Sequence, residues 1–334
     1  MSIVKMKKIT LTAVRSQKDE MLRELMLLGC LEISEPEALL CDPQVAPLVK
    51  RETSELEKYR GYSAQIAGAI NVIKHYAPFK TSLFAPRSDV HVQDFLREDT
   101  LNECLELAEK LADCDSRLRR LAALEAREYS VIESLLPWEP MALPLNSEGT
   151  KTAGVVFGAL PPSTDFAELE RALDDAVPEA QVLEISSDKD QLCVLAVYLR
   201  EKEDAVYDFL RSMGFSVSSL RSMAGTAGDN IKQVRKTIQD IRAESDTLRE
   251  QILGECQRRF ELQQAWDFVE TKIARAAASE RLLATDSTVT LTGWIPASSE
   301  KELAGALGKY TCAWALSDPA PEEYENVPVQ LKNN

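Results

Sequence analysis

A repeating apolar stripe in the last third of the chain constrains the fold more than any other feature. Between residues 229 and 284, apolar side chains recur at alternating steps of three and four, with no proline in the span. This spacing is typical of one face of a long helix that packs against another helix. The sequence therefore predicts a continuous helix of about 80 Å, at about 1.5 Å per residue. The stripe comprises Ile231, Val234, Ile238, Ile241, Ser245, Leu248, Ile252, Phe260, Ala265, Trp266, Val269, Ile273 and Ala277.

A second stripe of the same kind provides the packing partner. It lies in a predicted helix over residues 92–136, which ends at the proline-rich segment 137–144. The stripe comprises Leu101, Cys104, Ala108, Leu111, Asp115, Leu118 and Ala122, with Asp115 as a charged interruption. Because the intervening residues form a small separate unit, we expect the two helices to run antiparallel. A further helix is predicted from about Val45 to Ala77, before Pro78.

The segment between the two stripes changes to short elements. Their order is β-α-β-β-α-β, which is the ferredoxin-like arrangement. Ser163 or Thr164 is a candidate N-cap for the first helix, and Gly214 ends the second. The strands are predicted at 154–160, 181–186, 191–199 and 215–219, and the helices at 165–176 and 201–213.

The two ends of the chain predict a second α/β lobe. Residues 7–15 alternate as a strand does, and residues 30–34 form another strand. Between them, Ser16 is a candidate N-cap for a helix that Gly29 ends. Near the C-terminus a strand at 287–294, a helix at 298–307 with Ser298 or Ser299 as its cap, and a strand at 310–316 complete it. We expect the acidic tail to be extended.

These elements predict an α+β chain with two ferredoxin-like lobes joined by a long antiparallel helical coiled-coil rod, like a dumbbell. The Gly225–Gly228 segment is predicted to be a hinge that opens the long helix. The predicted parts are a proximal lobe (1–44 with 285–318), a rod (45–149 with 226–284), a distal lobe (150–225) and a linker (319–334).

Composition excludes several classes of protein. The net charge of -15 opposes binding to nucleic acid or anionic lipid; it suits a basic partner surface, or serves solubility alone. No secretory signal is predicted, and no apolar run approaches the ~20 residues of a membrane span. The seven cysteines are scattered without a C-x-x-C pair, so we predict buried thiols in a reducing compartment.

The residues that could perform chemistry do not form a recognisable site. The histidines, His75 and His91, lack further metal ligands at fixed spacing. The Gly305–Thr311 segment resembles a phosphate loop only superficially, because its helix precedes the glycines. We predict no catalytic, cofactor-binding or metal-binding residues.

Paired carboxylates and exposed aromatic candidates have simpler interpretations. Asp113 and Asp115 face different sides of a helix, and Asp188 with Asp190 is typical of a turn. Phe260 and Trp266 are candidates to anchor a partner protein, but we interpret them as core residues of the rod. The arginines of the rod are expected to form a solvated face; they are Arg117, Arg119, Arg120, Arg258 and Arg259.

Three short motifs resemble the start, the lobe-closing strand and the end of one family's soluble half. They are residues 1–9 with a helix ending at Leu28-Gly29, the G-W-[IV]-P element Gly293, Trp294, Ile295 and Pro296, and the P-x-x-L-K-N stretch 328–333. With the order of elements, the sequence resembles the N-terminal cytoplasmic domain of subunit I, or subunit a, of rotary V/A-type ATPases. In this family the G-W-I-P residues are structural.

The resemblance implies a non-catalytic component of the stator, at the cytoplasmic face of a membrane-embedded complex. That complex couples the hydrolysis or synthesis of ATP to the transport of protons or sodium ions. The implied partners are peripheral-stalk subunits E and G, the central-stalk adaptor (named C or d), and the protein's own membrane domain beside the rotor ring. This piece alone is expected to be soluble.

Two other classes stay open from the residues alone. A coiled-coil scaffold or tether, such as a septation or chromosome-organising protein, would dimerise through the rod. An enzyme would use a ferredoxin-like lobe to bind a small regulatory ligand, which requires a polar pocket with perturbed ionisable groups.

Overall fold

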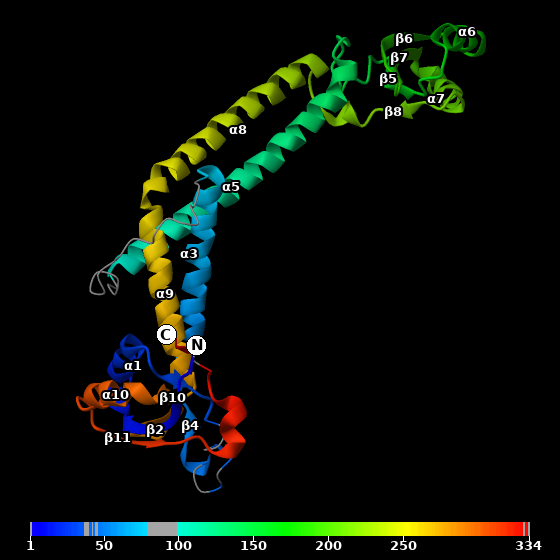
Figure 1. The fold of residues 1–334 in the computed structure, drawn as a ribbon. Coiled ribbons are helices and arrows are strands. Elements are labelled where there is room, and N and C mark those ends of the chain that lie inside the picture. Colours follow the sequence, from blue (N-terminus) through cyan, green and yellow to red (C-terminus); the bar gives the residue numbers. More distant parts are fainter. Residues whose placement is uncertain are drawn as a thin grey trace. The chain divides into compact units, whose positions relative to one another are not determined.

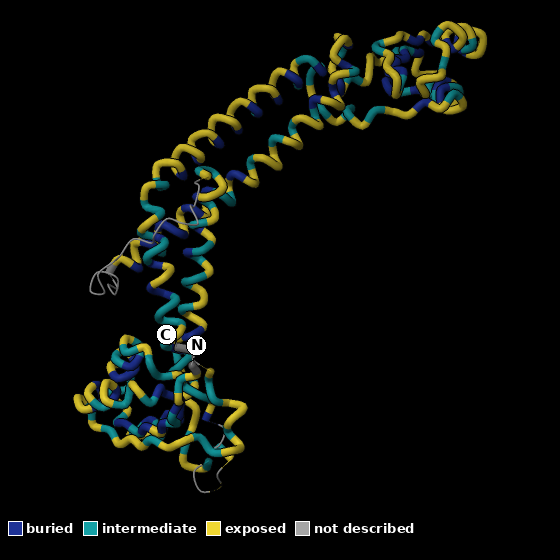
Figure 2. The backbone as a smooth tube through the Cα atoms, viewed as in Figure 1, coloured by how far each residue is buried: buried dark blue, intermediate teal, exposed yellow. Residues whose placement is uncertain are grey.

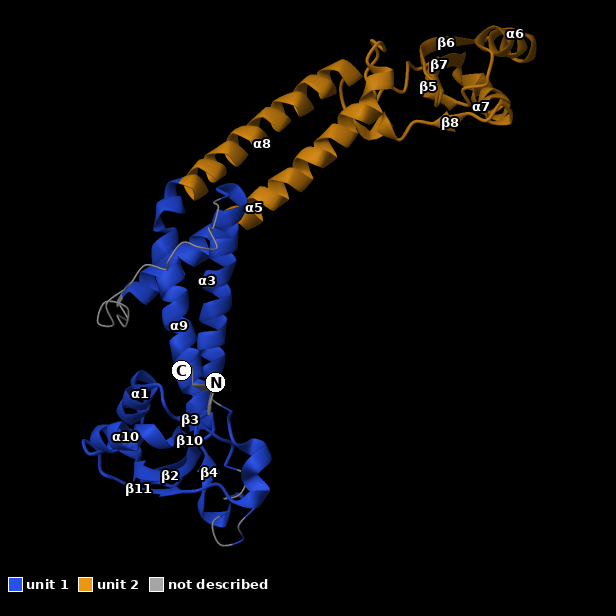
Figure 3. Cartoon of the chain, in the orientation of Figure 1, with its two compact units in different colours: residues 1–112, 254–334 blue, residues 113–253 orange. Residues whose placement is uncertain are grey.

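The computed structural model describes residues 2–36, 40–41, 43, 46–78, 99–329 and 331–332. The chain divides into two compact units, coloured separately in Figure 3. Unit 1 contains residues 1–112 and 254–334, and unit 2 contains residues 113–253. Figure 1 labels the elements of each. The four-part division predicted above stays a prediction.

Unit 1 contains a sheet built from both ends of the chain. Its antiparallel strands follow the order β11-β2-β10-β3, which is the pairing of a β-α-β-β-α-β unit. The short strands β9 and β4 extend the sheet beyond β10. The strands are β2 (Met6–Val14), β3 (Glu32–Ile33), β4 (Lys50–Arg51), β9 (Leu283–Ala284), β10 (Thr288–Pro296) and β11 (Cys312–Ser317).

One face of this sheet is covered by helices α1 (Lys18–Leu28) and α10 (Glu300–Leu307). Alternation along the strands sends every second residue into this core. The core residues from the sheet and the helices include Ile9, Leu11, Met21, Leu25, Leu291, Ile295, Leu303 and Leu307. The chain turns at Gly29, whose φ of 66° is left-handed and ends α1.

Three predictions for unit 1 are wrong. The helix expected from Val45 begins at Leu56, because a 3₁₀-helix (Ala46–Leu48) and β4 come first; β4 pairs with β9 and Leu48 is 72% exposed. The tail is not extended: it contains a 3₁₀-helix (Pro321–Asn326), and β12 (Leu331–Lys332) pairs with β1 (Ser2–Ile3).

The third correction concerns the long helix. It is interrupted: α8 (Ala227–Glu255) is followed by a 3₁₀ turn (Cys256–Arg258) and then α9 (Arg259–Glu280). Gly254, just before the turn, is a poor helix former, which lowers the cost of the interruption. The turn also separates the buried stripe of α8 from that of α9. The α9 stripe packs against α3 (Leu56–Tyr76), with Cα atoms of the two helices within 8 Å of each other.

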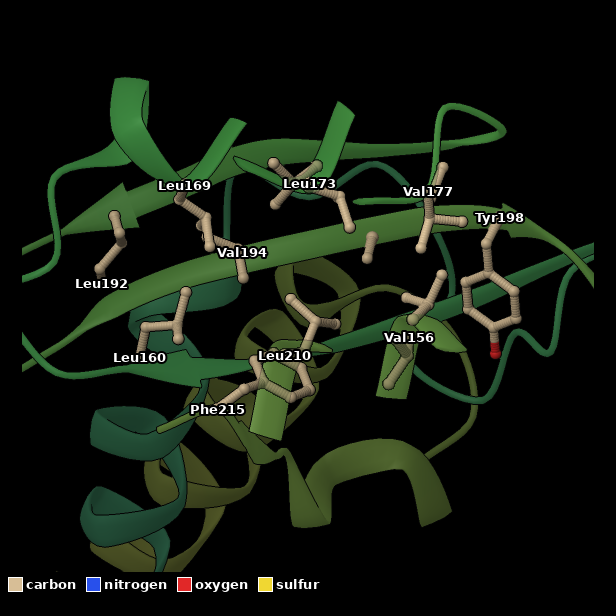
Figure 4. Close-up of a cluster of buried hydrophobic side chains, with 14 residues drawn as sticks. Val156, Leu160, Leu169, Leu173, Val177, Leu192, Val194, Tyr198, Leu210 and Phe215 are labelled. Atoms are coloured by element: carbon tan, nitrogen blue, oxygen red, sulfur yellow. The ribbon is translucent and has the colours of Figure 1, made fainter. Parts of the chain in front are cut away.

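Unit 2 contains a second sheet of the same type. Its antiparallel order is β6-β7-β5-β8, with helices α6 (Phe166–Ala176) and α7 (Glu203–Ser212). Figure 4 shows Leu169, Leu173 and Leu210 directed at the strand face that carries Val156 and Val194. The strands are β5 (Ala153–Leu160), β6 (Ala180–Ser187), β7 (Leu192–Leu199) and β8 (Ser216–Val217).

The cap of α6 differs from the prediction. Asp165, one residue after the predicted candidates, accepts hydrogen bonds from the backbone N–H groups of Ala167 and Glu168. The predicted turn between β6 and β7 is confirmed, because the Asp188 carboxylate accepts from the N–H groups of Asp190 and Gln191. Gly214, at φ 83°, follows α7 as predicted.

The opposite face of the unit 2 sheet is also buried. It packs against the ends of α5 (Asp99–Leu135) and α8 and the 3₁₀-helix Leu136–Trp138. Trp138 meets Phe157 edge-on, with ring centroids 4.9 Å apart. The cluster includes Leu135, Trp138, Met141, Leu145, Val155, Phe157, Cys193, Leu195, Ala227 and Ile231.

Within unit 2, α5 and α8 run antiparallel. Residues further along α5 contact residues that come earlier in α8. Cys114 contacts Gln251, Arg117 pairs with Glu244 at 2.7 Å, and Glu125 pairs with Arg242 at 2.7 Å. The burial colours of Figure 2 alternate along both helices. Most of the predicted stripe is buried, but Ala122 is exposed. A heptad repeat drifts on a helix of 3.6 residues per turn, which moves Ala122 off the buried face.

Candidate functional site

The G-W-I-P element forms the end of β10. Gly293 is opposite Ile9 on β2 and Ile33 on β3. A Cβ atom at this position would lie 2.3 Å from the carbonyl oxygen of Glu32. The residue must therefore lack a side chain for the short strand β3 to approach β10.

The other three residues of the element are buried in the sheet. Trp294 is only 4% exposed, Ile295 belongs to the core beneath α1 and α10, and Pro296 pairs with Met6 at the strand end. At these positions the three residues pack within the fold of unit 1. Ile295 is opposite Lys7, so this element and the N-terminal motif are neighbours.

The third motif is adjacent to the first. Leu331 of β12 pairs with Ile3 of β1, and upstream Lys8 forms an ion pair with Glu323 and Lys5 with Asp318 (3.1 Å). A cleft of about 640 Å³ lies beside the 3₁₀-helix Pro321–Asn326, and Lys8 and Trp294 are among its lining residues. Segments more than 280 residues apart in sequence are thus joined in unit 1.

One buried carboxylate was not predicted. Glu52 accepts hydrogen bonds from Arg15 Nε at 3.1 Å and Arg15 Nη2 at 3.0 Å, and Lys18 Nζ lies 3.9 Å away. Burial alone raises the pKa of Glu52, but the Arg15 hydrogen bonds and the charges of Lys18 and Arg15 outweigh it and hold the pKa below its usual value. The pair connects the residue that follows β2 to the segment that precedes α3.

A polar cleft of about 390 Å³ lies beside this pair, where the N-termini of α1 and α3 meet α9. Its lining is rich in ionisable and hydroxyl groups: Lys18, Asp19, Thr53, Ser54, Glu55, Tyr59, Lys272, Arg275, Ala276 and Ser279. No periodic signal marks residues 50–55, so sequence reasoning missed both the cleft and Glu52.

An apolar cleft of about 410 Å³ lies between α1, β3 and α9. Its lining includes Leu22, Leu25, Leu31, Ile33, Ala274 and Ala278. Arg281 bridges its rim, donating to the carbonyl of Ile33 at 2.9 Å and lying 3.4 Å from Glu35.

The aromatic residues predicted as core of the long helix are exposed. Phe260 is 45% exposed and Trp266 is 37% exposed, so the core interpretation is wrong. Trp266 donates its indole N–H to Ser63 Oγ on α3 at 3.0 Å. The stripe on α9 is instead formed by Leu262, Ala265, Phe268, Val269, Ala276 and Ser279.

The structure does not bring the other candidates together into a site. His75 stacks edge-on with Tyr76, and His91 lies outside the described residues. Asp115 pairs with Arg119 at 2.7 Å. Gly305 lies inside α10 and Gly308 follows it, with a helix before the glycines. Among the described residues, no group of three or more His, Cys, Asp and Glu could hold a metal ion.

A helix that crosses a bilayer must be both long and apolar. In the described part of the chain, no helix meets both requirements.

No protein-family model matches the chain, and no curated protein matches it. Among solved structures, the chain is similar to the crystal structure of the cytoplasmic N-terminal domain of subunit I, homolog of subunit a, of V-ATPase. The identity is 16% and the TM-score 0.41, over 93% of this chain and 100% of that one.

Proposed function

We propose that this chain is a non-catalytic component of a V/A-type rotary ATPase, the part of subunit I that connects the stator. One observation carries the proposal. The N-terminal segment that resembles the family's first motif pairs in unit 1 with each of the other two segments, which lie near the opposite end of the chain, through β2–β10 and β1–β12. Motifs that matched by chance would have no reason to meet.

The organisation of the chain supports the same proposal. Two sheets of the same strand order are connected in sequence by helices of 37 and 29 residues. Long helices with buried stripes and interhelical ion pairs resist bending, which suits a component that carries force. Ion pairs such as Arg117–Glu244 hold α5 beside α8 within unit 2.

In the proposed function, the lobes bind the peripheral-stalk subunits E and G, and the chain also contacts the central-stalk adaptor, named C or d. It lies at the cytoplasmic face of the membrane and holds the stator against the torque of rotation. The dumbbell, with a coiled-coil rod between the lobes, is part of this proposal.

Cross-linking of the purified chain to E–G heterodimers tests the partner assignment. Cross-links from lysines of the lobes, such as Lys189 or Lys301, are expected. A mixture with an unrelated coiled-coil heterodimer of similar length is the control, since it measures adventitious contact with the long helices. Cross-links confined to α5, α8 and α9 would contradict the proposal.

Solution scattering with a mass measurement tests the dumbbell. A monomer with a maximum dimension of about 100 Å is expected from lobes joined by helices that rise about 1.5 Å per residue. A compact particle would contradict the dumbbell. A parallel dimer would favour a coiled-coil scaffold instead.

A further inference from the structure

The edge strand β11 differs from the other edge strands of the two large sheets. A sheet edge exposes backbone N–H and C=O groups, and native proteins usually protect it by shortness, charge, irregular pairing or a covering segment. The edges β3, β4 and β8 have two residues each, and β3 and β4 carry charged side chains. The longer edge β6 contains Glu184, has an irregular register after it, and lies against the 3₁₀-helix Leu136–Trp138, where Ser186 donates to the carbonyl of Pro137.

β11 has none of these protections. Its six residues include no charged residue and no proline, and its register with β2 is regular from Cys312 to Ser317. It is the outermost strand of its sheet (Figure 1), and in the described part of the chain no strand pairs with its outer edge. A long edge of this kind is a template for another strand.

The pairing with β2 determines which backbone groups of β11 face outward. Val14 donates its N–H to the carbonyl of Thr311 at 3.2 Å, and hydrogen-bonded pairs alternate along an antiparallel ladder. Every second residue from Thr311 onward therefore bonds to β2. The residues between them direct their N–H and C=O groups to the outer edge, about 6.8 Å apart along the strand. They are Cys312, Trp314 and Leu316.

The side chains along this edge favour apolar residues on one side of an added strand. Trp314 is on the sheet face that α1 and α10 cover, yet it is 37% exposed. Cys312 and Leu316 flank it on the same face and are partly buried against the core. A residue directly opposite Trp314 on an added strand would lie about 5 Å away and cover its ring.

The surroundings of β11 are acidic at both ends. Burial and the charges of Glu24 and Glu20 raise the pKa of Tyr310, just before the strand. Residues 318–326, just after it, include four acidic residues and no basic one. The net charge of -15 also opposes the pairing of two copies of the chain. Lysines offset part of the local charge; they are Lys5, Lys8 and Lys309.

We propose that β11 binds an extended segment of another protein, which joins the sheet as an antiparallel strand with apolar residues beside Trp314 and basic residues at its ends. The antiparallel direction matches every strand pair of this sheet. Main-chain hydrogen bonds supply the affinity, and the contact with Trp314 supplies the specificity. This surface does not depend on the stator role, because it uses the sheet of unit 1 alone.

The probe is a short synthetic peptide in which alternating threonine and valine residues lie between terminal lysines. Calorimetry with the full chain should show saturable binding. In an antiparallel pair, a valine opposite Trp314 exchanges both hydrogen bonds with it, whereas the threonine N–H groups point away from the edge. N-methylation of the valines should therefore weaken binding by about a hundred-fold, the loss of several hydrogen bonds.

The matched control peptide carries the N-methyl groups on the threonines and should bind as the unmodified peptide does. Equal weakening by the two methylation patterns would overturn the proposal, as would no binding of the unmodified peptide. These peptides test the edge without any change in the protein, so the result does not depend on the folding of a variant.

A variant of the protein tests the same contact. Trp314→Lys introduces a charge of the kind that protects natural edges and should abolish binding of the peptide. The matched control is Leu183→Lys, which changes an apolar residue, 50% exposed, on the edge strand β6 of unit 2. It should leave the affinity unchanged, and equal loss in both variants would contradict the proposal. Circular dichroism establishes that both variants fold.

Hydrogen exchange locates the bound peptide and sedimentation identifies self-pairing. In the free chain, the N–H groups of Trp314 and Leu316 should exchange faster than those of Ala313 and Ala315, and the peptide should slow them. Sedimentation over a range of protein concentrations should show a monomer. A dimer that Trp314→Lys abolishes, in a chain that does not bind the peptide, would overturn the assignment to another protein in favour of a second copy.

Discussion

The two sheets share one strand order but differ in what covers them. The unit 2 sheet is buried on both faces, by α6 and α7 on one side and by Leu135, Trp138 and Ile231 on the other. The unit 1 sheet is buried on the face beneath α1 and α10. Its other face carries small residues, among them the threonines Thr10, Thr12 and Thr290 and the alanines Ala313 and Ala315.

The difference is visible in the amino-acid sequence of the strands. β5 and β7 are almost continuously apolar, as expected for strands buried on both faces. β2 alternates apolar and polar residues, as expected for a strand with one solvated face. The same topology therefore supports two environments, and burial of the second face decides which residues each strand can carry.

The largest effect on stability is expected for Phe157→Ala, which tests whether the second face of the unit 2 sheet is a core. Phe157 is buried on the second face of the unit 2 sheet against Trp138. Its truncation should cost about 3–5 kcal/mol of unfolding free energy, the range for large aromatic residues in cores. Urea unfolding followed by circular dichroism measures it. A loss below about 1 kcal/mol would mean that this face is not a core.

The two sheets should respond alike at one pair of glycines. Gly293→Ala and Gly158→Ala each place a Cβ about as close to a backbone oxygen, 2.3 Å from Glu32 and 2.2 Å from Ser216. Each should cost about 1–3 kcal/mol, as for overpacked sites. The control is Gly61→Ala in α3, where no atom lies within 4 Å of the added carbon.

That control should stabilise the protein by about 0.5–1 kcal/mol, because alanine is the better helix former. Unfolding in urea gives all three values. Tolerance of Gly293→Ala would contradict the close approach of β3 to β10.

The charged junction of unit 1 predicts a pH effect without a counterpart in unit 2. Glu52→Gln should cost about 1–2 kcal/mol at neutral pH, the scale of a hydrogen bond to a charged group. Because the pKa of folded Glu52 is lowered, the unfolded chain takes up its proton first as the pH falls. The stabilisation is therefore fully present above about pH 4.5 and declines as the pH falls through the folded pKa.

Unfolding free energies of the wild type and Glu52→Gln, measured from pH 6 to pH 3, check this prediction. The two curves should converge at low pH. A difference that stays constant across this range would show that the carboxylate charge is not responsible.

The smallest effect is expected on the open face of unit 1. The hydroxyls of Thr12 and Thr290 are 2.9 Å apart across β2 and β10. Thr290→Ala should change the unfolding free energy by less than about 1 kcal/mol, as for a cross-strand pair. A cost comparable to that of Phe157→Ala, measured in the same urea series, would mean that the two sheets do not differ as described.

The sequence was informative where one periodicity ran long enough to be read. The longer strands and helices around both sheets follow from alternation along β2 and β5 and from the glycines after α1 and α7. The stripe of α8 from Ile231 to Ile252 is buried as expected. Local patterns suffice there, because each element exposes one side and buries the other.

It was not informative where pairing joins distant residues. The two-residue strands β4, β9 and β12 are too short to show alternation, and each exists because of its partner. The 3₁₀ turn before α9 depends on which helix packs on which side. The Arg15–Glu52 pair joins residues 37 positions apart, and neither residue stands out in its own segment.

The paired glycines have a consequence for detecting distant relatives. Gly158 and Gly293 each lie in a long strand, at the point where a two-residue strand pairs with it. Gly158 is opposite Val217 and Gly293 is opposite Ile33. A diverged chain can exchange almost any apolar core residue for another of similar volume, but it cannot place a Cβ at these crossings. In distant relatives whose overall sequence identity is low, a glycine at each of these two strand positions would therefore help to align the two sheets.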